Sequence, residues 1–456
     1  MSGTLSFDQL KALTDSGEID TVLACQVDMQ GRLMGKRFHA SYFCKSAYEE
    51  THSCNYLLAT DMEMETVEGY KSTSWESGYG DYVMKPDLET IRLVPWLEKT
   101  AFIMCDVLDH NTHKPVPHSP RAVLQAQIKR LNDLGMTAFM ATELEFFLFE
   151  QSFEEAHEGG YHGLKTWGKY NEDYHIFQTT KEESVMRAIR NGLHDAGIEV
   201  ECSKGEASAG QEEINVKYAD ALTTGDNHAF VKNACKEIAW AQGRALTFLA
   251  KWSNEAAGSS SHVHQSLWSI DGKTPLFYDE NRKYGMSELM EQYVAGLLHN
   301  ASDITYFLAP YINSYKRFAE GTFAPTKAIW SKDNRTAGYR ICGDGTKGVR
   351  VECRVGGSDL NPYLAMAALL AAGIDGIENK RELEPEFSGD AYAASDARSI
   401  PSTLREATSV LNDSAMLRAA MGDEVINHYV RCAGWEQEIF DKQVTDWEVA
   451  RGFERA

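Results

Sequence analysis

Four short segments of the chain alternate chemically active polar side chains with apolar ones: Glu143–Leu148, Glu213–Lys217, Ser261–Leu267 and Arg350–Val355. Successive side chains of a β-strand point to opposite faces, so each segment predicts a strand with one functional face and one packed face. For any one of them a solvated sheet face is the simpler interpretation. Four such strands in one chain instead predict a shared site.

The residue types on these faces indicate divalent metal and phosphate chemistry. Glu143 and Glu145 share a face and are flanked by apolar residues, so their charges would repel in a partly buried site unless cations compensated them. Carboxylates with an imidazole suit Mg²⁺ or Mn²⁺, whereas zinc prefers more cysteine or histidine. Arginines such as Arg350 and Arg354 bind phosphates and carboxylates through their planar fork. This combination is typical of phosphoryl transfer.

Two glycine-containing segments are weaker signals. The run 343–348 fits the pattern GxGxxG, but it lies between two strand-like segments rather than between a strand and a helix. A hairpin loop is therefore expected there, not a dinucleotide-binding turn. The run 258–261 directly precedes a strand with two histidines, which favours a close approach to a ligand. The sequence contains no Walker A motif, so a P-loop enzyme is disfavoured.

Composition excludes several other functions. The chain has 456 residues, 43% of them hydrophobic, and a formal net charge of -22. Such an acidic protein is repelled by nucleic acid and by anionic lipid. Nine cysteines without a CxxC pair favour reduced thiols. We find no signal-peptide pattern and no apolar run of about 18 residues, so we expect a cytoplasmic protein without a membrane span.

The pattern along the chain predicts an α+β fold rather than a regular βαβ alternation. Prolines cluster between residues 86 and 120, which places a domain boundary near residue 113 and gives domains 1–112 and 113–456. Ser119-Pro120 is expected to begin a helix, and 151–175 to form a surface loop. A hairpin is expected over 21–42. Other helices are predicted at 5–15, 181–196, 228–245, 286–301, 361–378, 402–411 and 436–454.

Six motifs occur in the order and at about the spacing found in the glutamine synthetase family. They are Glu143-x-Glu145-Phe146-Phe147, Glu206-(x)4-Gln211-x-Glu213, His262-x-His264-x-Ser266-Leu267, Asn313-Ser314-Tyr315-Lys316-Arg317, Asn334-Arg335 and Arg350-x-Glu352-x-Arg354. From about residue 20 to the C-terminus, the chain resembles this family.

The resemblance implies a small β-grasp-like N-terminal domain and a large catalytic domain with a curved antiparallel sheet flanked by helices. It implies a homododecamer of two rings with active sites between subunits. One metal would be held by Glu145, Glu206 and Glu213, and the second by Glu143, His262 and Glu352. ATP would contact Glu201, His264, Ser266, Arg340, Lys347 and Arg350, and glutamate would contact Glu145, Gly258, Arg317 and Arg354.

The implied reaction has two steps. ATP phosphorylates the γ-carboxylate of glutamate, and a nitrogen nucleophile then displaces phosphate. Arg335 and Arg317 would be catalytic, with Arg335 stabilising the transferring phosphoryl group. Asp28 would reach the nucleophile site of the next subunit and help to remove a proton from the incoming cation. A simple turn residue is the alternative interpretation of Asp28.

The chain departs from glutamine synthetases at one informative position. Phe323 stands where those enzymes have a flap glutamate that encloses and deprotonates ammonium. An aromatic side chain suits an alkyl or aryl group on the nitrogen, so Phe323 and Asp28 would form an amine pocket. We therefore expect a ligase that makes γ-glutamyl amides from organic amines. The alternatives are a glutamine synthetase that uses ammonia, in which Glu320 replaces the flap glutamate, and a catalytically inactive relative. The sequence does not specify the amine.

Overall fold

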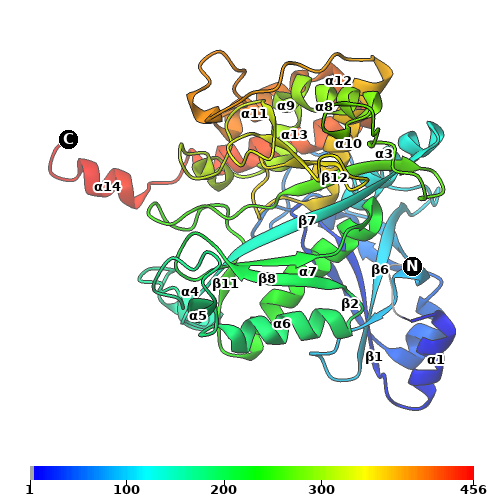
Figure 1. Ribbon diagram of the computed structural model, residues 1–456. Helices are drawn as coiled ribbons and strands as arrows, with labels where there is room; N and C mark the ends of the chain where they lie inside the picture. The colour runs from blue at the N-terminus through cyan, green and yellow to red at the C-terminus, as the bar shows by residue number, and fades with distance from the viewer. Residues whose placement is uncertain (1–4) are drawn as a thin grey trace.

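The computed structural model describes residues 5–456, which form two β-sheets and a surrounding set of helices (Figure 1). The first sheet has the order β2-β1-β6-β4-β3, with β5 paired to β6. Its strands are β1 Thr21–Val27, β2 Leu33–His39, β3 Thr51–Cys54, β4 Asp81–Pro86, β5 Arg92–Leu93 and β6 Thr100–Asp109. β1 and β2 form the predicted antiparallel hairpin, and β1 runs parallel to β6.

A small core supports the first sheet. Helix α1 (Phe7–Asp15) begins with a capping box at Ser6 and buries Leu10 against Val22 of β1 and Ile103 of β6. This helix lies at the outer edge of the molecule near the N-terminus (Figure 1). A short helix α2 (Ala40–Tyr42) and a π-helical turn over Phe43–Ala47 close the same core.

The second sheet contains all four strands that the alternating segments predict. Its order is β13-β14-β15-β12-β7-β9-β8, and β10 and β11 pair with β7. β13 and β14 run parallel, whereas the other pairings in this sheet are antiparallel as expected. The strands are β7 Met136–Leu148, β8 Val200–Gly205, β9 Gln211–Val216, β10 Ala219–Asp220, β11 Leu246–Thr247, β12 Val263–Ser269, β13 Trp330–Lys332, β14 Tyr339–Cys342 and β15 Arg350–Cys353.

Apolar helices cover the packed side of this sheet. α3 (Pro120–Asp133) and α7 (Ala221–Ala241) pack on β7, and α10 (Pro362–Glu378) packs on both helices. α3 begins at Pro120 as predicted. α8–α13 gather above β7 and β12 in Figure 1, and α6 and α7 lie below β7. The remaining members of this group are α6 Glu183–Asp195, α8 Glu288–His299, α9 Ala301–Leu308, α11 Leu404–Asp413, α12 Ala415–Met421 and α13 Asp423–Phe440.

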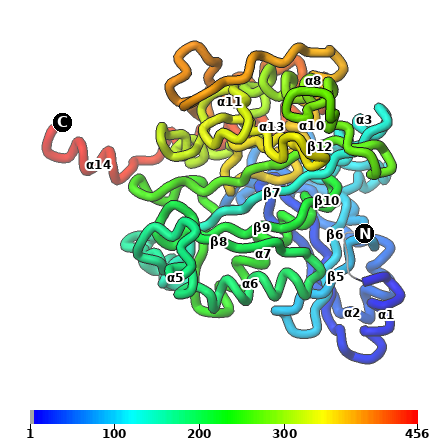
Figure 2. The backbone as a smooth tube through the Cα atoms, viewed as in Figure 1, coloured from blue at the N-terminus to red at the C-terminus, as the bar shows by residue number. Residues whose placement is uncertain are grey.

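Two helix predictions and one loop prediction needed correction. The single helix expected at 436–454 is wrong: α13 ends at Phe440, and α14 (Asp446–Gly452) starts anew from a capping box between Thr445 and Glu448. α7 begins at Ala221 instead of residue 228, because Asp220 caps it. The segment 151–175 is not only a loop, since Ser152 caps α4 (Phe153–Glu158); α5 (Ile176–Thr179) follows it. α14 projects away from the body (Figure 2).

Within residues 5–456, no helix has both the length and the apolar composition needed to cross a bilayer.

Candidate active site

Three glutamates meet where β7, β8 and β9 lie side by side. Glu145 and Glu213 are direct cross-strand partners, and Glu206 directly follows β8. One carboxylate oxygen from each lies within 4.8 Å of the others. The backbone N–H of Ser260 donates a hydrogen bond of 2.7 Å to Glu145, and Gln211 donates one of 3.2 Å. The strand register therefore brings together the first predicted metal-ligand set.

Burial and like charges disfavour the charged forms of two carboxyls in this group. Burial, with the charges of Glu206 and Glu213, raises the pKa of Glu145 well above its usual value. Burial and the nearby Glu143 and Glu206 raise the pKa of Glu213 to about 8. Lys204 lies 2.5 Å from Glu206, a contact that the sequence analysis did not foresee. Carboxylates packed this closely favour a bound cation.

The second predicted metal-ligand set also gathers, on β7, β12 and β15. His262 Nδ1 lies 2.7 Å from Glu143 and 3.4 Å from Glu352, and the three ligand atoms lie within 4.8 Å of one another. Although burial opposes it, hydrogen bonds from His262 and His264 hold the pKa of Glu143 well below its usual value. Glu352 is fully buried and also ion-pairs with Arg354.

A divalent cation fits these two sets. Nε2 of His262 is buried and makes no hydrogen bond with any described residue. A neutral imidazole nitrogen among carboxylates is a ligand suited to Mn²⁺ or Mg²⁺, and the five glutamates supply hard oxygen ligands. Because Glu143 and Glu145 are two positions apart on β7, the two sets adjoin each other on one face of the sheet.

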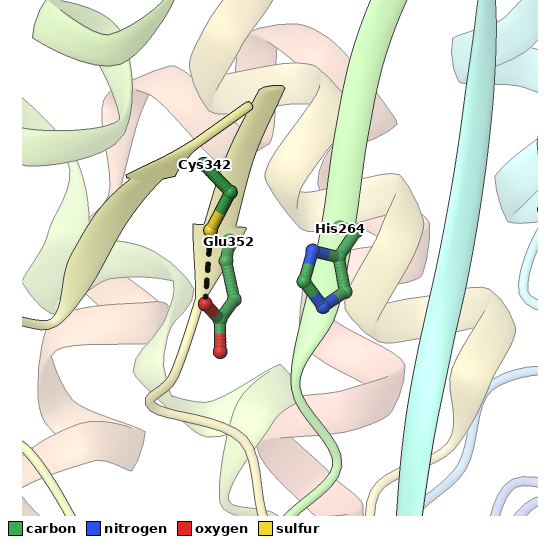
Figure 3. Close-up of side chains that lie close together, drawn as sticks. All are labelled: His264, Cys342 and Glu352. Atoms are coloured by element: carbon green, nitrogen blue, oxygen red, sulfur yellow. Dashed lines mark hydrogen bonds between the residues drawn. The ribbon is translucent and has the colours of Figure 1, made fainter. Parts of the chain in front are cut away.

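Cys342 belongs to this region but was not foreseen. Its thiol donates a hydrogen bond of 3.4 Å to Glu352, and His264 lies on the other side of that carboxylate (Figure 3). Burial, with the charge of Glu352, raises the pKa of the Cys342 thiol to about 12, so the thiol is a neutral donor. Only its alternation with Arg340 on one strand hinted that it would lie near the site.

A cavity of about 440 Å³ opens beside the metal-ligand sets. It is lined by Glu143 and by five of the six predicted ATP contacts: Glu201, His264, Ser266, Lys347 and Arg350. The sixth, Arg340, instead bridges Asp333 and Glu352. Phe139, Tyr218 and Trp268 supply aromatic walls that the sequence analysis missed. Strand alternation could have indicated Phe139, because it is directly opposite Ser266 in the pairing of β7 with β12.

Of the other predicted glutamate contacts, Arg317 and Gly258 lie near Glu145, whereas Arg354 lies beside the second metal-ligand set. Arg317 is fully buried and donates to Ser260 and to the backbone oxygens of Val355 and Arg354. Its Nε makes no hydrogen bond with the described chain. Gly258 has no room for a side chain, because a Cβ there would lie 2.5 Å from Cγ of Arg317.

Arg335 is exposed, and its backbone oxygen accepts a hydrogen bond of 3.2 Å from Arg354. Arg354 is buried and lies beside His262, with 3.5 Å between Nη1 and Nδ1. Arg335 and Arg354 therefore connect the protein surface to the second metal-ligand set.

The two predicted amine-pocket residues have very different surroundings. Phe323 is 52% exposed and has a φ of 56°, which is unusual for a bulky residue. Asp28 is fully buried, and its carboxylate accepts hydrogen bonds from the backbone of Gln30 and from the backbone and side chain of Arg32. Within one chain Asp28 thus stabilises its own hairpin turn.

A model of the glutamine synthetase catalytic domain matches residues 117–452. The chain belongs to the glutamine synthetase family. The resemblance inferred from the six motifs is therefore confirmed, and so is the α+β fold.

Several members of the glutamine synthetase family match almost the whole chain. A gamma-glutamylethanolamide synthetase of Streptomyces coelicolor is 45% identical over 99% of this chain and 96% of its own length. A glutamate–isopropylamine ligase of a Pseudomonas species is 36% identical over 97% of each chain. Among solved structures, the ADP complex of GmaS, a gamma-glutamylmethylamide synthetase, has a TM-score of 0.85 at 26% identity, over 98% of this chain and 99% of that one.

Proposed function

We propose that this chain is an ATP-dependent ligase that joins the γ-carboxylate of glutamate to an organic amine through γ-glutamyl phosphate. The observation that supports it most strongly is the pair of adjoining metal-ligand sets, the second of which contributes Glu143 to the wall of a cavity that Lys347 and Arg350 also line. The similarity to ligases for ethanolamine and isopropylamine supports the same assignment.

The two sets would hold Mg²⁺ or Mn²⁺, which when bound supplies positive charge to the phosphates of ATP. The residues of the chain do the remaining work. Lys347 and Arg350 bind the triphosphate, and the aromatic wall of the cavity receives the base. Arg335 moves from its exposed position to the transferring phosphoryl group, and Arg354 binds a carboxylate of glutamate.

Arg317 has a positioning role in this scheme. Its hydrogen bond of 2.8 Å to Ser260 fixes the backbone whose N–H binds Glu145. Asp28 is proposed to act across a subunit boundary, where its hairpin turn would meet the active site of a neighbouring copy. An acceptor at that point would take the proton from the ammonium form of the amine.

The choice of nitrogen nucleophile is tested by a panel of amines. Purified enzyme with glutamate, ATP and Mg²⁺ or Mn²⁺ should release phosphate faster with at least one of ethanolamine, isopropylamine, methylamine or a polyamine than with ammonium. The mass of the product should equal that of the γ-glutamyl amide. Equal or faster turnover with ammonium would identify a glutamine synthetase instead, and no phosphate release with any nucleophile would indicate an inactive relative.

We further propose a homo-oligomer, with the double-ring dodecamer as its form. α14 supports this proposal: this helix projects from the body (Figure 2), and Trp447 on it and Phe453 at its C-terminal cap are 66% and 83% exposed. Apolar side chains displayed in this way favour contact with another copy.

Replacing both Trp447 and Phe453 by aspartate is expected to lower the assembly mass, because the charges would oppose burial of this helix. Light scattering after size-exclusion chromatography measures the mass. Replacement of the neighbouring Arg455 by alanine is the matched control and should leave the mass unchanged. An unaltered mass in the double variant would exclude α14 from the interface.

A further inference from the structure

A third acidic group lies on the opposite face of the catalytic sheet. Glu212 is on β9 between Gln211 and Glu213, and its side chain therefore points away from the metal-ligand sets described above. Glu172 from the loop before α5 and Glu182 at the start of α6 reach the same place. One carboxylate oxygen from each of these three residues lies within 4.8 Å of the others.

The carboxylate of Glu182 is the decisive member of this group. Its side chain is fully buried against the carboxyls of Glu172 and Glu212 and the backbone N–H of Gly168, yet neither of its oxygens makes a well-aligned hydrogen bond within residues 5–456. One oxygen of Glu172 and one of Glu212 are likewise buried and unpartnered in that part of the chain. The other oxygen of Glu172 accepts a bond of 2.6 Å from the backbone N–H of Gly210.

The nearest cationic side chains are engaged elsewhere. Lys181 donates to Gln178 at 2.6 Å. Arg190 donates to Ser203 at 2.8 Å and to Glu183 at 2.6 Å. Three buried carboxylates are therefore left without a contacting cation from the described residues, so the group must either bind a cation or take up protons.

Two glycines let the surrounding backbone approach these carboxyl groups closely. A Cβ on Gly168 would lie 1.4 Å from one oxygen of Glu172 and 2.7 Å from an oxygen of Glu182. Only glycine lets the loop pass this close to both carboxylates. Gly205 is similarly restricted, because a Cβ there would lie 2.7 Å from Cβ of Glu172. The loop and β8 thus pack closely around the carboxyl groups.

We propose that Glu172, Glu182 and Glu212 bind a third divalent cation, separate from the two catalytic ones. Three carboxylates without nitrogen or sulfur ligands suit Mg²⁺, Mn²⁺ or Ca²⁺, whose oxygen ligands lie at about 2.0–2.6 Å from the ion. Ligands on opposite sides of one ion are then about 4–5 Å apart, in agreement with the spacing of this group. The cation ties the loop before α5 and the start of α6 to β9, the strand that positions Glu213.

Mn²⁺ is the probe that tests this proposal. Crystals of the intact enzyme soaked in MnCl₂ should show an anomalous peak between Glu172, Glu182 and Glu212, apart from those at the catalytic sets. In solution, the Glu182→Gln variant should bind one Mn²⁺ ion fewer per chain than the wild-type enzyme does. Equilibrium dialysis, or EPR of the free Mn²⁺, measures this stoichiometry. Glu183→Gln changes the adjacent partly exposed glutamate and should leave the stoichiometry unchanged.

The outcomes separate this proposal from the proposed function. A map with peaks only at the catalytic sets would overturn the third site and would show that the carboxyls share protons instead. A peak only at the third site would contradict the ligase assignment but not the third site. If Glu182→Gln does not fold, the wild-type map decides the question by itself.

Discussion

Glu145→Ala is expected to abolish ATP-dependent phosphate release with every amine. Glu145 belongs to the first ligand set, where it is paired with Glu213 across β7 and β9 and accepts a hydrogen bond from the backbone N–H of Ser260. Losing a metal ligand at this position removes several kcal/mol of charge stabilisation, equivalent to a loss of about 10³-fold or more in turnover. Phosphate release measured with saturating ATP and amine is the readout.

The substitution should leave the fold and the assembly intact. Burial and like charge raise the pKa of Glu145, so a neutral replacement relieves repulsion in the metal-free protein. The isosteric Glu145→Gln should accordingly melt no lower than wild type in the presence of a chelator. Glu199→Ala, which changes an exposed glutamate paired with Lys217, is the control and should retain full activity. Turnover retained in Glu145→Ala would refute its metal role.

Alternation along one strand was sufficient to predict which of the proposed metal ligands share a face, because strand geometry is local. Alternation places Glu143 and Glu145 on one face of β7 whatever the rest of the fold does. Register then decides which strands meet, and here it pairs Glu145 with Glu213 and places β12 between β7 and β15. That register depends on packing across the whole sheet, so the sequence alone did not determine it. The family motifs supplied what alternation could not.

Other features depend on contacts between residues far apart in sequence. Cys342 matters because β14 pairs with β15 and brings its thiol to Glu352. Glu172 and Glu182 meet Glu212 only after a long loop folds over the back of the sheet. The division of the C-terminal segment into α13 and α14 depends on a local signal, the capping box at Thr445. The sequence-based prediction overlooked it and assigned one longer helix. The proposed domain boundary near residue 113 stays a prediction.

Phe323→Glu is expected to shift nucleophile preference from organic amines towards ammonium. Phe323 is half exposed with a φ of 56°, a conformation that is costly for an aromatic residue and is typically kept at functional positions. A carboxylate in its place would attract and deprotonate ammonium, and it would remove the apolar surface that an alkyl group contacts. The ratio of kcat/KM for ammonium to that for the preferred amine should rise by about 10- to 100-fold.

Two further variants isolate the cause of this shift. Phe323→Leu keeps an apolar side chain at the same backbone position and should preserve the preference for amines. Glu320→Ala tests whether the nearby carboxylate already serves ammonium, and it should leave the ratio unchanged if Phe323 alone sets the preference. An unaltered ratio in Phe323→Glu would mean that the amine is selected elsewhere, and the subunit boundary at Asp28 would then be the remaining place to look. Asp28 is buried in its own turn and paired with Arg32, so its carboxylate would have to leave Arg32 to act at that boundary.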